Sequence, residues 1–270
     1  GAGLMAVRPS SSILSGTSER RSGADRRQTM SQDAYIQLKS VSKKYSRGGE
    51  DLVVLDQLDL NIPDGDYAAL MGPSGSGKTT ILNLVGGLDV PDSGTVTVAE
   101  TEVSSIATRQ LPAWRARHVG FVFQSFNLLP VLTAHENVML PLQLTPLSAA
   151  ERKKQADFAL EIVGLSDRAG HRPSQLSGGQ EQRVAIARAI ATDPDVIIAD
   201  EPTGDLDRNS ADEILELLNR LNEELGKTIL MVTHDPAAAS NARRILKLDK
   251  GHLVSDEINR QRSGQTQGEA

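Results

Sequence analysis

The stretch GPSGSGKTT at residues 72–80 directly follows the apolar run YAALM at residues 67–71. Its spacing matches the phosphate-binding pattern G-x-x-x-x-G-K-[ST], and the apolar pattern after it favours a helix. In such a loop successive backbone N–H groups turn toward phosphate oxygens, and the following helix adds the positive end of its dipole. The stretch therefore predicts a strand, a nucleotide-binding loop and a helix, in that order.

The residues of this loop have distinct expected tasks. The ammonium of Lys78 is expected to reach the β- and γ-phosphates, and the hydroxyl of Thr79 to ligate Mg²⁺. The nucleotide contacts are expected from Gly72, Pro73, Ser74, Gly75, Ser76, Gly77, Lys78, Thr79 and Thr80.

A second run, VIIADE at residues 196–201, ends in two carboxylates. A continuous β-branched run is typical of a parallel strand that is buried on both faces. At its carboxyl end we expect Asp200 to face Mg²⁺ and Glu201 to polarise the attacking water. The alternative is an acidic loop after a core strand, which would be the default without the phosphate loop.

A second glycine-rich motif, LSGGQ at residues 176–180, precedes an alanine-rich apolar segment. Ser177 and Gln180 have capping-box spacing, so Ser177 is expected to start a helix whose first N–H groups are left open by Gly178 and Gly179. A second anion site cannot serve the same phosphates from the same side. The simplest geometry closes it over a nucleotide held by another copy; the alternative is an ordinary capped helix.

Other capping-box spacings mark further helix starts. Thr133, Ser148 and Ser210 are each followed three residues later by glutamate, which predicts helices that begin after them. Strands that alternate with helices along the chain predict an α/β fold with a mostly parallel sheet.

The phosphate loop, LSGGQ, ADEPTGDLD at residues 199–207 and THD at residues 233–235 occur here in an order that resembles the nucleotide-binding domains of ABC transporters. The resemblance covers roughly residues 35–257. It implies a P-loop NTPase core at residues 31–257, with an antiparallel β portion near the N-terminus and an inserted helical subdomain at about 125–192. It also implies a head-to-tail dimer in which each ATP lies between the phosphate loop of one subunit and the LSGGQ of the other.

The resemblance also assigns roles to single residues. It implies that Tyr45 stacks on adenine, that Gln124 touches Mg²⁺ and the attacking water, and that Asp207 crosses the dimer interface. It implies that His234 contacts the γ-phosphate and that Ser177, Gly178, Gly179 and Gln180 bind the partner's nucleotide. Each has a structural alternative: a surface tyrosine, a solvated loop residue, a helix-capping acid or a structural histidine. The other four histidines are interpreted as structural: His118, His135, His171 and His252.

Residues 126–141 and 201–207 resemble the macrolide-exporter and lipoprotein-release branch, whose ATPases work with a separate membrane permease. This implies a permease that docks near residues 124–129 and a peripheral position on the cytoplasmic face of the inner membrane. Asp205 and the pair Glu181 and Gln182 depart from the residues more usual in the family. The alternative is a non-transport ABC ATPase of the cell-division type, which shares these motifs.

The charge and composition of the chain argue against a nucleic-acid-binding protein. The net charge of −6 and the 3% aromatic content argue against a nucleic-acid partner. In DNA-repair relatives a long coiled coil separates the phosphate loop from LSGGQ. The sequence between these motifs here has no sustained heptad pattern. The chain has no cysteine and no uninterrupted apolar stretch near 18 residues.

The two ends differ from the rest of the chain. Residues 1–30 hold five arginines and two acidic residues among serines and glycines, which predicts disorder, with an organellar transit peptide as the alternative. Residues 258–270 are expected to be a loose polar tail.

Overall fold

A computed structural model describes residues 34–47 and 50–259 of the chain, and within them two sheets. The larger sheet has the order β10-β9-β3-β8-β7-β6 and is parallel except for β10. Its strands are β3 (Tyr67–Met71), β6 (Val119–Phe123), β7 (Val196–Asp200), β8 (Thr228–Val232), β9 (Arg244–Asp249) and β10 (His252–Ile258). The predicted α/β class with a mostly parallel sheet is confirmed.

The smaller sheet is antiparallel and is built mainly from the N-terminal part of the described chain, as expected. Its order is β2-β1-β4-β5. Its strands are β1 (Ala34–Arg47), β2 (Glu50–Pro63), β4 (Ser93–Val98) and β5 (Thr101–Glu102).

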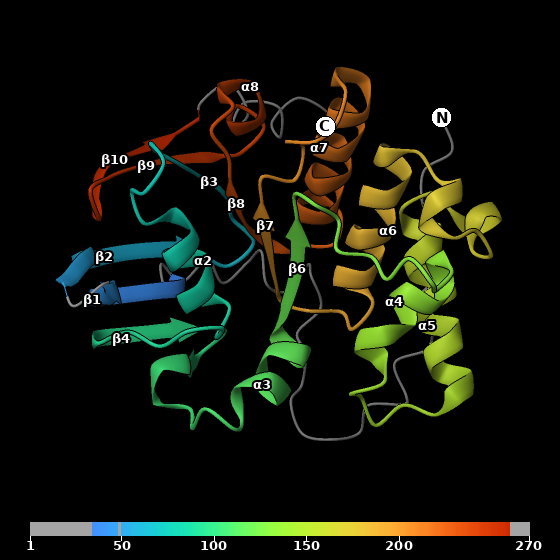
Figure 1. The fold of residues 1–270 in the computed structure, drawn as a ribbon, viewed down its shortest axis with the longest axis horizontal. Helices are drawn as coiled ribbons and strands as arrows, with labels where there is room; N and C mark the ends of the chain where they lie inside the picture. The colour runs from blue at the N-terminus through green and yellow to red at the C-terminus, as the bar shows by residue number, and fades with distance from the viewer. Residues whose placement is uncertain (1–33, 48–49, 260–270) are drawn as a thin grey trace, which may run out of the picture. The chain divides into compact units, whose positions relative to one another are not determined.

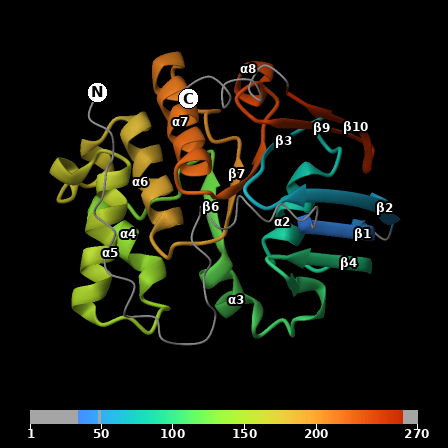
Figure 2. The same ribbon diagram turned by 180° about the vertical axis from the view of Figure 1, so that it is seen from behind.

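Helices cover both faces of the parallel sheet (Figures 1 and 2). Both views place α4, α5 and α6 together on one side, and α2 with the antiparallel sheet on the other. The helices are α2 (Lys78–Val85), α3 (Leu111–His118), α4 (Ala134–Leu142), α5 (Ala149–Ile162), α6 (Gly178–Ile190), α7 (Arg208–Glu223) and α8 (Pro236–Ala239). Helices α4, α5 and α6 fall within the range expected for the helical subdomain.

The core forms two clusters of buried side chains, one on each face of the parallel sheet. In β7, Ile197 belongs to the cluster that includes α4 to α7, while the adjacent Ile198 belongs to the cluster with α2 and the antiparallel sheet. In β8, Ile229 and Leu230 divide in the same way. Successive strand residues point to opposite faces, so a strand covered on both sides must be apolar throughout. This is the physical reason for the unbroken apolar runs in the sequence.

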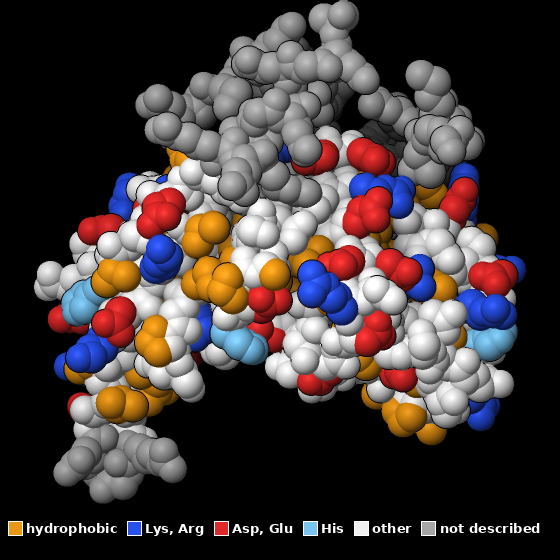
Figure 3. Space-filling view, turned by 90° about the horizontal axis from the view of Figure 1, so that it is seen from above, with side chains coloured by type: hydrophobic (Ala, Val, Ile, Leu, Met, Phe, Trp, Pro, Cys, Tyr) orange, Lys and Arg blue, Asp and Glu red, His pale blue; other side chains and the backbone are white. Residues whose placement is uncertain are grey.

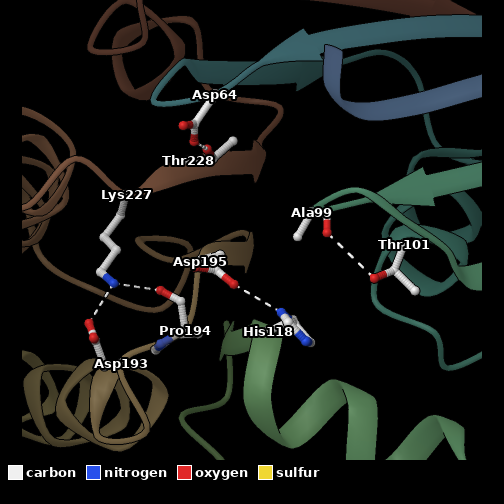
Figure 4. Close-up of polar contacts among 9 residues, drawn as sticks. All are labelled: Asp64, Ala99, Thr101, His118, Asp193, Pro194, Asp195, Lys227 and Thr228. Carbon is white, nitrogen blue, oxygen red and sulfur yellow. Dashed lines mark hydrogen bonds and ion pairs between the residues drawn. The ribbon is translucent and has the colours of Figure 1, made fainter. Parts of the chain in front are cut away.

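Polar contacts connect the amino ends of the parallel strands (Figure 4). The Nζ of Lys227, before β8, donates to Oδ1 of Asp193 at 2.7 Å and to the carbonyl of Pro194 at 2.6 Å, before β7. Nδ1 of His118, before β6, lies 2.9 Å from Oδ2 of Asp195. The starts of three neighbouring strands are thus bonded together at the edge opposite their carboxyl ends.

Three of the predicted helix starts are confirmed and one is wrong. Capping boxes begin α4 at Thr133, α5 at Ser148 and α6 at Ser177. Helix α7, however, begins at Asp207, whose carboxylate accepts from the backbone N of Ser210 at 3.1 Å. Ser210 is therefore inside the helix, because an acceptor three residues earlier already caps the first turn.

Charged side chains of both signs lie interspersed with small groups of hydrophobic ones on the face in Figure 3. Among the described residues, no helix has the length and apolar composition needed to cross a membrane. The interpretation of residues 1–30 lies outside the described part of the chain. So does that of the tail 258–270, except for its first two residues: Ile258 ends β10, and Asn259 donates to the carbonyls of Ser240 and Ala242. These two residues are therefore held and not part of a loose tail.

Candidate functional site

The phosphate loop connects the carboxyl end of β3 to the first residue of α2, as predicted. Gly72 tolerates no side chain, since a Cβ there would lie 2.2 Å from the carbonyl oxygen of Leu248 and 2.8 Å from Oγ of Ser76. No side chain caps α2, and its first turn holds no acidic residue. The amino end of α2 thus keeps its positive dipole end and uncapped N–H groups for an anion.

The side chains of Lys78 and Ser76 place polar atoms against the backbone of the phosphate loop. Nζ of Lys78 donates to the carbonyl oxygens of Gly72 and Pro73, both at 2.8 Å, and so lies across the loop. Oγ of Ser76 is buried against Gly72 without a hydrogen-bond partner in the described chain. A buried unpaired hydroxyl is costly, and a phosphate oxygen would satisfy it.

Glu201 and His234 are brought together by neighbouring strands. Glu201 follows β7 and His234 follows β8, and Oε1 of Glu201 lies 2.8 Å from Nδ1 of His234. The hydrogen bond and the negative charge of Glu201 raise the pKa of His234, and the nearby Asp235 adds to this. Burial and the ammonium of Lys78 act in the opposite direction.

Asp200 lies at the same edge. Partial burial raises the pKa of Asp200, and the adjacent carboxylate of Glu201 raises it further, while Lys78 lowers it. Because Lys78 acts on both Asp200 and His234, these groups share one electrostatic neighbourhood. Four predicted residues, Lys78, Asp200, Glu201 and His234, therefore meet where the parallel strands end, the usual position of a ligand in such sheets.

Gln124 directly follows β6 at this edge, and the nitrogen of its side-chain amide is engaged by a neighbouring loop. Its Nε2 donates to Oδ1 of Asp205 at 2.7 Å, in the turn after Glu201. The structure places Gln124 beside the loop that carries Glu201. The side chain of Gln124 makes no hydrogen bond to Asp200 or Thr79, the other expected metal ligands. Thr79 lies exposed in the first turn of α2.

The LSGGQ motif forms the start of α6, on the other face of the sheet from α2. Oγ of Ser177 accepts from the backbone N of Gln180 at 3.3 Å, and Oε1 of Gln180 accepts from the backbone N of Ser177 at 3.0 Å. Ser177 and Gly178 are exposed, while Gly179 is buried so close to Ser210 that a Cβ would lie 2.9 Å from Oγ of that serine. The motif is thus packed on the start of α7, where Asp207 is the cap.

Tyr45 lies near the end of β1 with 38% of its surface exposed. Its hydroxyl donates to Oδ2 of Asp89 at 2.8 Å, and Nζ of Lys43 lies 5.2 Å from the ring centroid. One part of the Tyr45 side chain is thus held, while another part stays accessible to a ligand.

Two residues of α6 that the sequence did not single out as site residues hold the loops around the cluster. The buried Gln182 donates through Nε2 to the carbonyls of Phe123, before Gln124, and Pro202, after Glu201, at 3.2 and 2.5 Å. Arg188 donates to the carbonyls of Phe126 and Asn127 at 2.8 and 2.5 Å. Every residue type offers a carbonyl, so the acceptor positions carry no sequence signal for these contacts.

Comparison with known proteins identifies the family. The family model described as "ABC transporter" matches residues 55–204. The chain is 46% identical over 224 residues to the macrolide export ATP-binding/permease protein MacB of Burkholderia thailandensis, covering 83% of this chain and 34% of that protein. The chain thus spans about a third of the length of the MacB proteins it matches.

Shorter relatives match almost end to end. The ABC transporter ATP-binding protein YknY of Bacillus subtilis is 49% identical, covering 81% of this chain and 95% of that protein. A solved structure of the cassette MJ0796, described as dimeric, post-hydrolysis and bound to ADP and Pi, superposes with a TM-score of 0.76 at 45% identity. The superposition covers 83% of this chain and 99% of the MJ0796 chain. The MJ0796 protein is from Methanocaldococcus jannaschii. The phosphate loop, the cluster at the strand ends and these matches lead to one conclusion: the chain belongs to the ABC transporter family, as an ATP-binding cassette.

Proposed function

We propose that two copies of the chain bind two ATP molecules head to tail, with each ATP between the phosphate loop of one copy and the LSGGQ motif of the other. The supporting observation is the separation of the two motifs: α2 packs on one face of the parallel sheet and α6 on the other. Ser177 and Gly178 are exposed at the start of α6, where N–H groups attract an anion. A second copy supplies this helix end to the nucleotide. The solved MJ0796 structures are also described as dimeric.

The cluster of Lys78, Glu201 and His234 supports the roles expected of these residues. Lys78 neutralises phosphate charge, and the carboxylate of Glu201 orients and polarises the attacking water. Because Nδ1 of His234 is bonded to Glu201, Nε2 remains to face the γ-phosphate. The raised pKa of His234 favours the imidazolium form, whose positive charge stabilises charge that develops on the phosphate.

The donor set also fits Mg²⁺. Burial, and after it the charge of the adjacent Glu201, raise the pKa of Asp200, and a cation would stabilise the two carboxylates together. Thr79 adds an exposed hydroxyl. Hard oxygen donors of this kind suit Mg²⁺, which when bound neutralises charge on the β- and γ-phosphates. Gln124 would join these ligands through Oε1, since its Nε2 donates to Asp205.

Glu201→Gln is the decisive variant for this ATPase. We expect its turnover to fall by about 10²–10⁴-fold, since the amide cannot act as a base, while ATP binding persists. Size-exclusion chromatography with ATP and Mg²⁺ should show a dimer that the unmodified chain forms only transiently. Lys78→Ala should instead lose ATP binding.

Glu216→Gln is the matched control, because Glu216 is exposed on α7, away from the strand ends. It should hydrolyse ATP at the unmodified rate. Normal turnover by Glu201→Gln would remove Glu201 from the proposed role, and a monomer at saturating ATP would argue against the dimer.

We further propose that the dimer drives a membrane permease, from a peripheral position on the cytoplasmic face of the inner membrane. The MacB relatives are named as combined ATP-binding and permease proteins, and the chain matches about a third of their length. After Gln124, Leu128 packs against the core, whereas Leu129 and Val131 are 47% and 70% exposed. These two side chains offer an apolar contact beside the ATP site.

A pull-down from solubilised membranes with Glu201→Gln, ATP and Mg²⁺ tests this partner. A permease that is captured by Glu201→Gln, and lost when Leu129→Asp is added, would support transport through this contact. Leu225→Asp is the control, since Leu225 is similarly exposed, at 44%, after α7. If only soluble or cytoskeletal proteins are captured, the chain is a non-transport ATPase.

A further inference from the structure

The Tyr45 side chain is held by a carboxylate from the loop that follows α2. Its hydroxyl donates to Oδ2 of Asp89 at 2.8 Å, and Oδ1 of Asp89 accepts from Nζ of Lys43 at 2.8 Å. Both carboxylate oxygens of Asp89 are therefore used. One orients the phenol, and the other is paired with a cation.

Lys43 is held in place by burial and by a second hydrogen bond. It is only 7% exposed, and its Nζ also donates to the carbonyl of Val90 at 2.8 Å. Although burial raises the pKa of Asp89, the hydrogen bonds from Lys43 and Tyr45 hold it below its ordinary value. Burial and the bond to Asp89 raise the pKa of Tyr45, and they outweigh the hydrogen bond with the side chain of Thr80 and the charge of Lys43, which lower it. The phenol therefore stays protonated as the donor to Asp89.

The loop that carries Asp89 is hydrogen-bonded both to α2 and to β1, the strand that carries Tyr45. The backbone N of Asp89 donates to the carbonyl of Asn83 in α2 at 3.2 Å. Three residues on, Oδ2 of Asp92 accepts from the backbone N of Lys44 at 2.6 Å. Helix α2 thus connects two parts of one site: its amino end is the phosphate loop, and the loop after its carboxyl end holds Tyr45.

We infer that Asp89 is a positioning residue for the nucleotide, which fixes the Tyr45 ring in the orientation that stacks on the base. The inference rests on the adenine contact expected of Tyr45. A half-exposed tyrosine loses rotamer freedom when a ligand stacks on it, which weakens binding. Because Asp89 already immobilises the ring in the free protein, ATP does not have to order it. The effect falls on the base and not on the phosphates.

Calorimetric titration of the full chain with ATP and with inorganic tripolyphosphate, both with Mg²⁺, tests the inference. We expect Asp89→Asn and Tyr45→Phe each to weaken ATP binding by about two- to twelve-fold, the range for one side chain that must be ordered. Tyr45→Ala, which removes the ring, should weaken it by about five- to 150-fold. Tripolyphosphate affinity should not change, and kcat at saturating ATP should stay constant while KM rises.

The double variant Asp89→Asn, Tyr45→Phe isolates the contact. If Asp89 acts through the hydroxyl, the Asp89→Asn change should add nothing in the Tyr45→Phe background. Asp59→Asn is the charge control: Asp59 is exposed on β2 and accepts from the backbone N of Ser40 at 2.8 Å. It should leave both affinities unchanged.

The outcomes separate this inference from the function on which it rests. If Tyr45→Ala loses ATP affinity but Asp89→Asn and Tyr45→Phe do not, the adenine contact stands and the role of Asp89 is overturned. If Tyr45→Ala keeps full ATP affinity, the adenine contact itself fails. Equal losses of ATP and tripolyphosphate affinity in Asp89→Asn would show a general disturbance of the loop and also overturn the inference.

Discussion

At the scale of single residues, Glu201 is held in an unusual backbone conformation. Its φ is +48°, a region that non-glycine residues seldom adopt. Its backbone N donates to the carbonyl of Val232 at 2.9 Å and its carboxylate contacts His234 at 2.8 Å, so β8 and the residues after it hold both parts of Glu201. Strained conformations persist when the surroundings fix them, and they are concentrated at functional sites. In this conformation the carboxylate lies beside the imidazole of His234.

The contact between Glu201 and His234 gives a pH prediction. Native contacts raise the pKa of His234 above its ordinary 6.5, the carboxylate of Glu201 foremost. Their contribution to stability is thus complete below pH 6.5 and is lost as the pH rises through the raised value. NMR titration of the histidine ring protons should show this raised pKa in the unmodified chain and a fall toward 6.5 in Glu201→Gln. His234→Ala identifies the signal, and an unchanged pKa in Glu201→Gln would show that Glu201 is not the cause.

At the scale of elements, α6 connects the LSGGQ motif with the segment after Gln124. Arg188 donates to the carbonyls of Phe126 and Asn127, which both have positive φ values, +55° and +52°. Burial lowers the pKa of Arg188, so the two carbonyls compensate for the loss of water around its charge. Arg188 therefore bonds α6 to the loop that precedes the exposed Leu129.

Arg188→Met tests this connection, since methionine keeps much of the apolar stem but donates no hydrogen bond. We expect the free energy of unfolding to fall by about 1–3 kcal/mol, because hydrogen bonds to a charged group are lost. Hydrogen exchange at residues 125–129 should accelerate more than elsewhere. Arg220→Met is the control: it removes an exposed pair with Glu224 at 3.5 Å, which contributes about 0–1 kcal/mol. Unchanged exchange at 125–129 would contradict the connection.

At the scale of the whole molecule, the phosphate loop and the LSGGQ motif precede helices on different faces of one sheet. In the proposed head-to-tail dimer, a complete ATP site therefore requires two copies. This predicts that ATP stabilises the Glu201→Gln protein in a way that depends on protein concentration. At about 100 times the dissociation constant, ligand binding adds about 2.7 kcal/mol, which raises the Tm of a cassette of this size by about 5–10 °C. Differential scanning calorimetry at several protein concentrations measures both effects.

A variant at the start of α6 separates ATP binding from dimer formation. Adding Ser177→Arg to Glu201→Gln should retain stabilisation by ATP but abolish its dependence on protein concentration, because a large cation blocks the second copy. Adding Lys78→Ala should abolish both. Concentration dependence that survives Ser177→Arg would contradict the proposed place of LSGGQ in the dimer.

The sequence by itself determined the parallel strands, the phosphate loop and the helix starts at Thr133, Ser148 and Ser177. It could do so because each depends on neighbours: strands buried on both faces are apolar throughout, and a capping box needs only residues three apart. The same local reasoning put the start of α7 at Ser210, because the spacing to Glu213 cannot show that Asp207 caps the turn first.

Only the tertiary structure decided which distant groups meet. It paired Gln124 with Asp205, Tyr45 with Asp89, and Arg188 with two backbone carbonyls. It also placed α2 and α6 on opposite faces of the sheet. Contacts between residues tens of positions apart leave no spacing in the sequence, and a carbonyl acceptor is the same in every residue. Such contacts are fixed only when the strands pair and the helices pack on them.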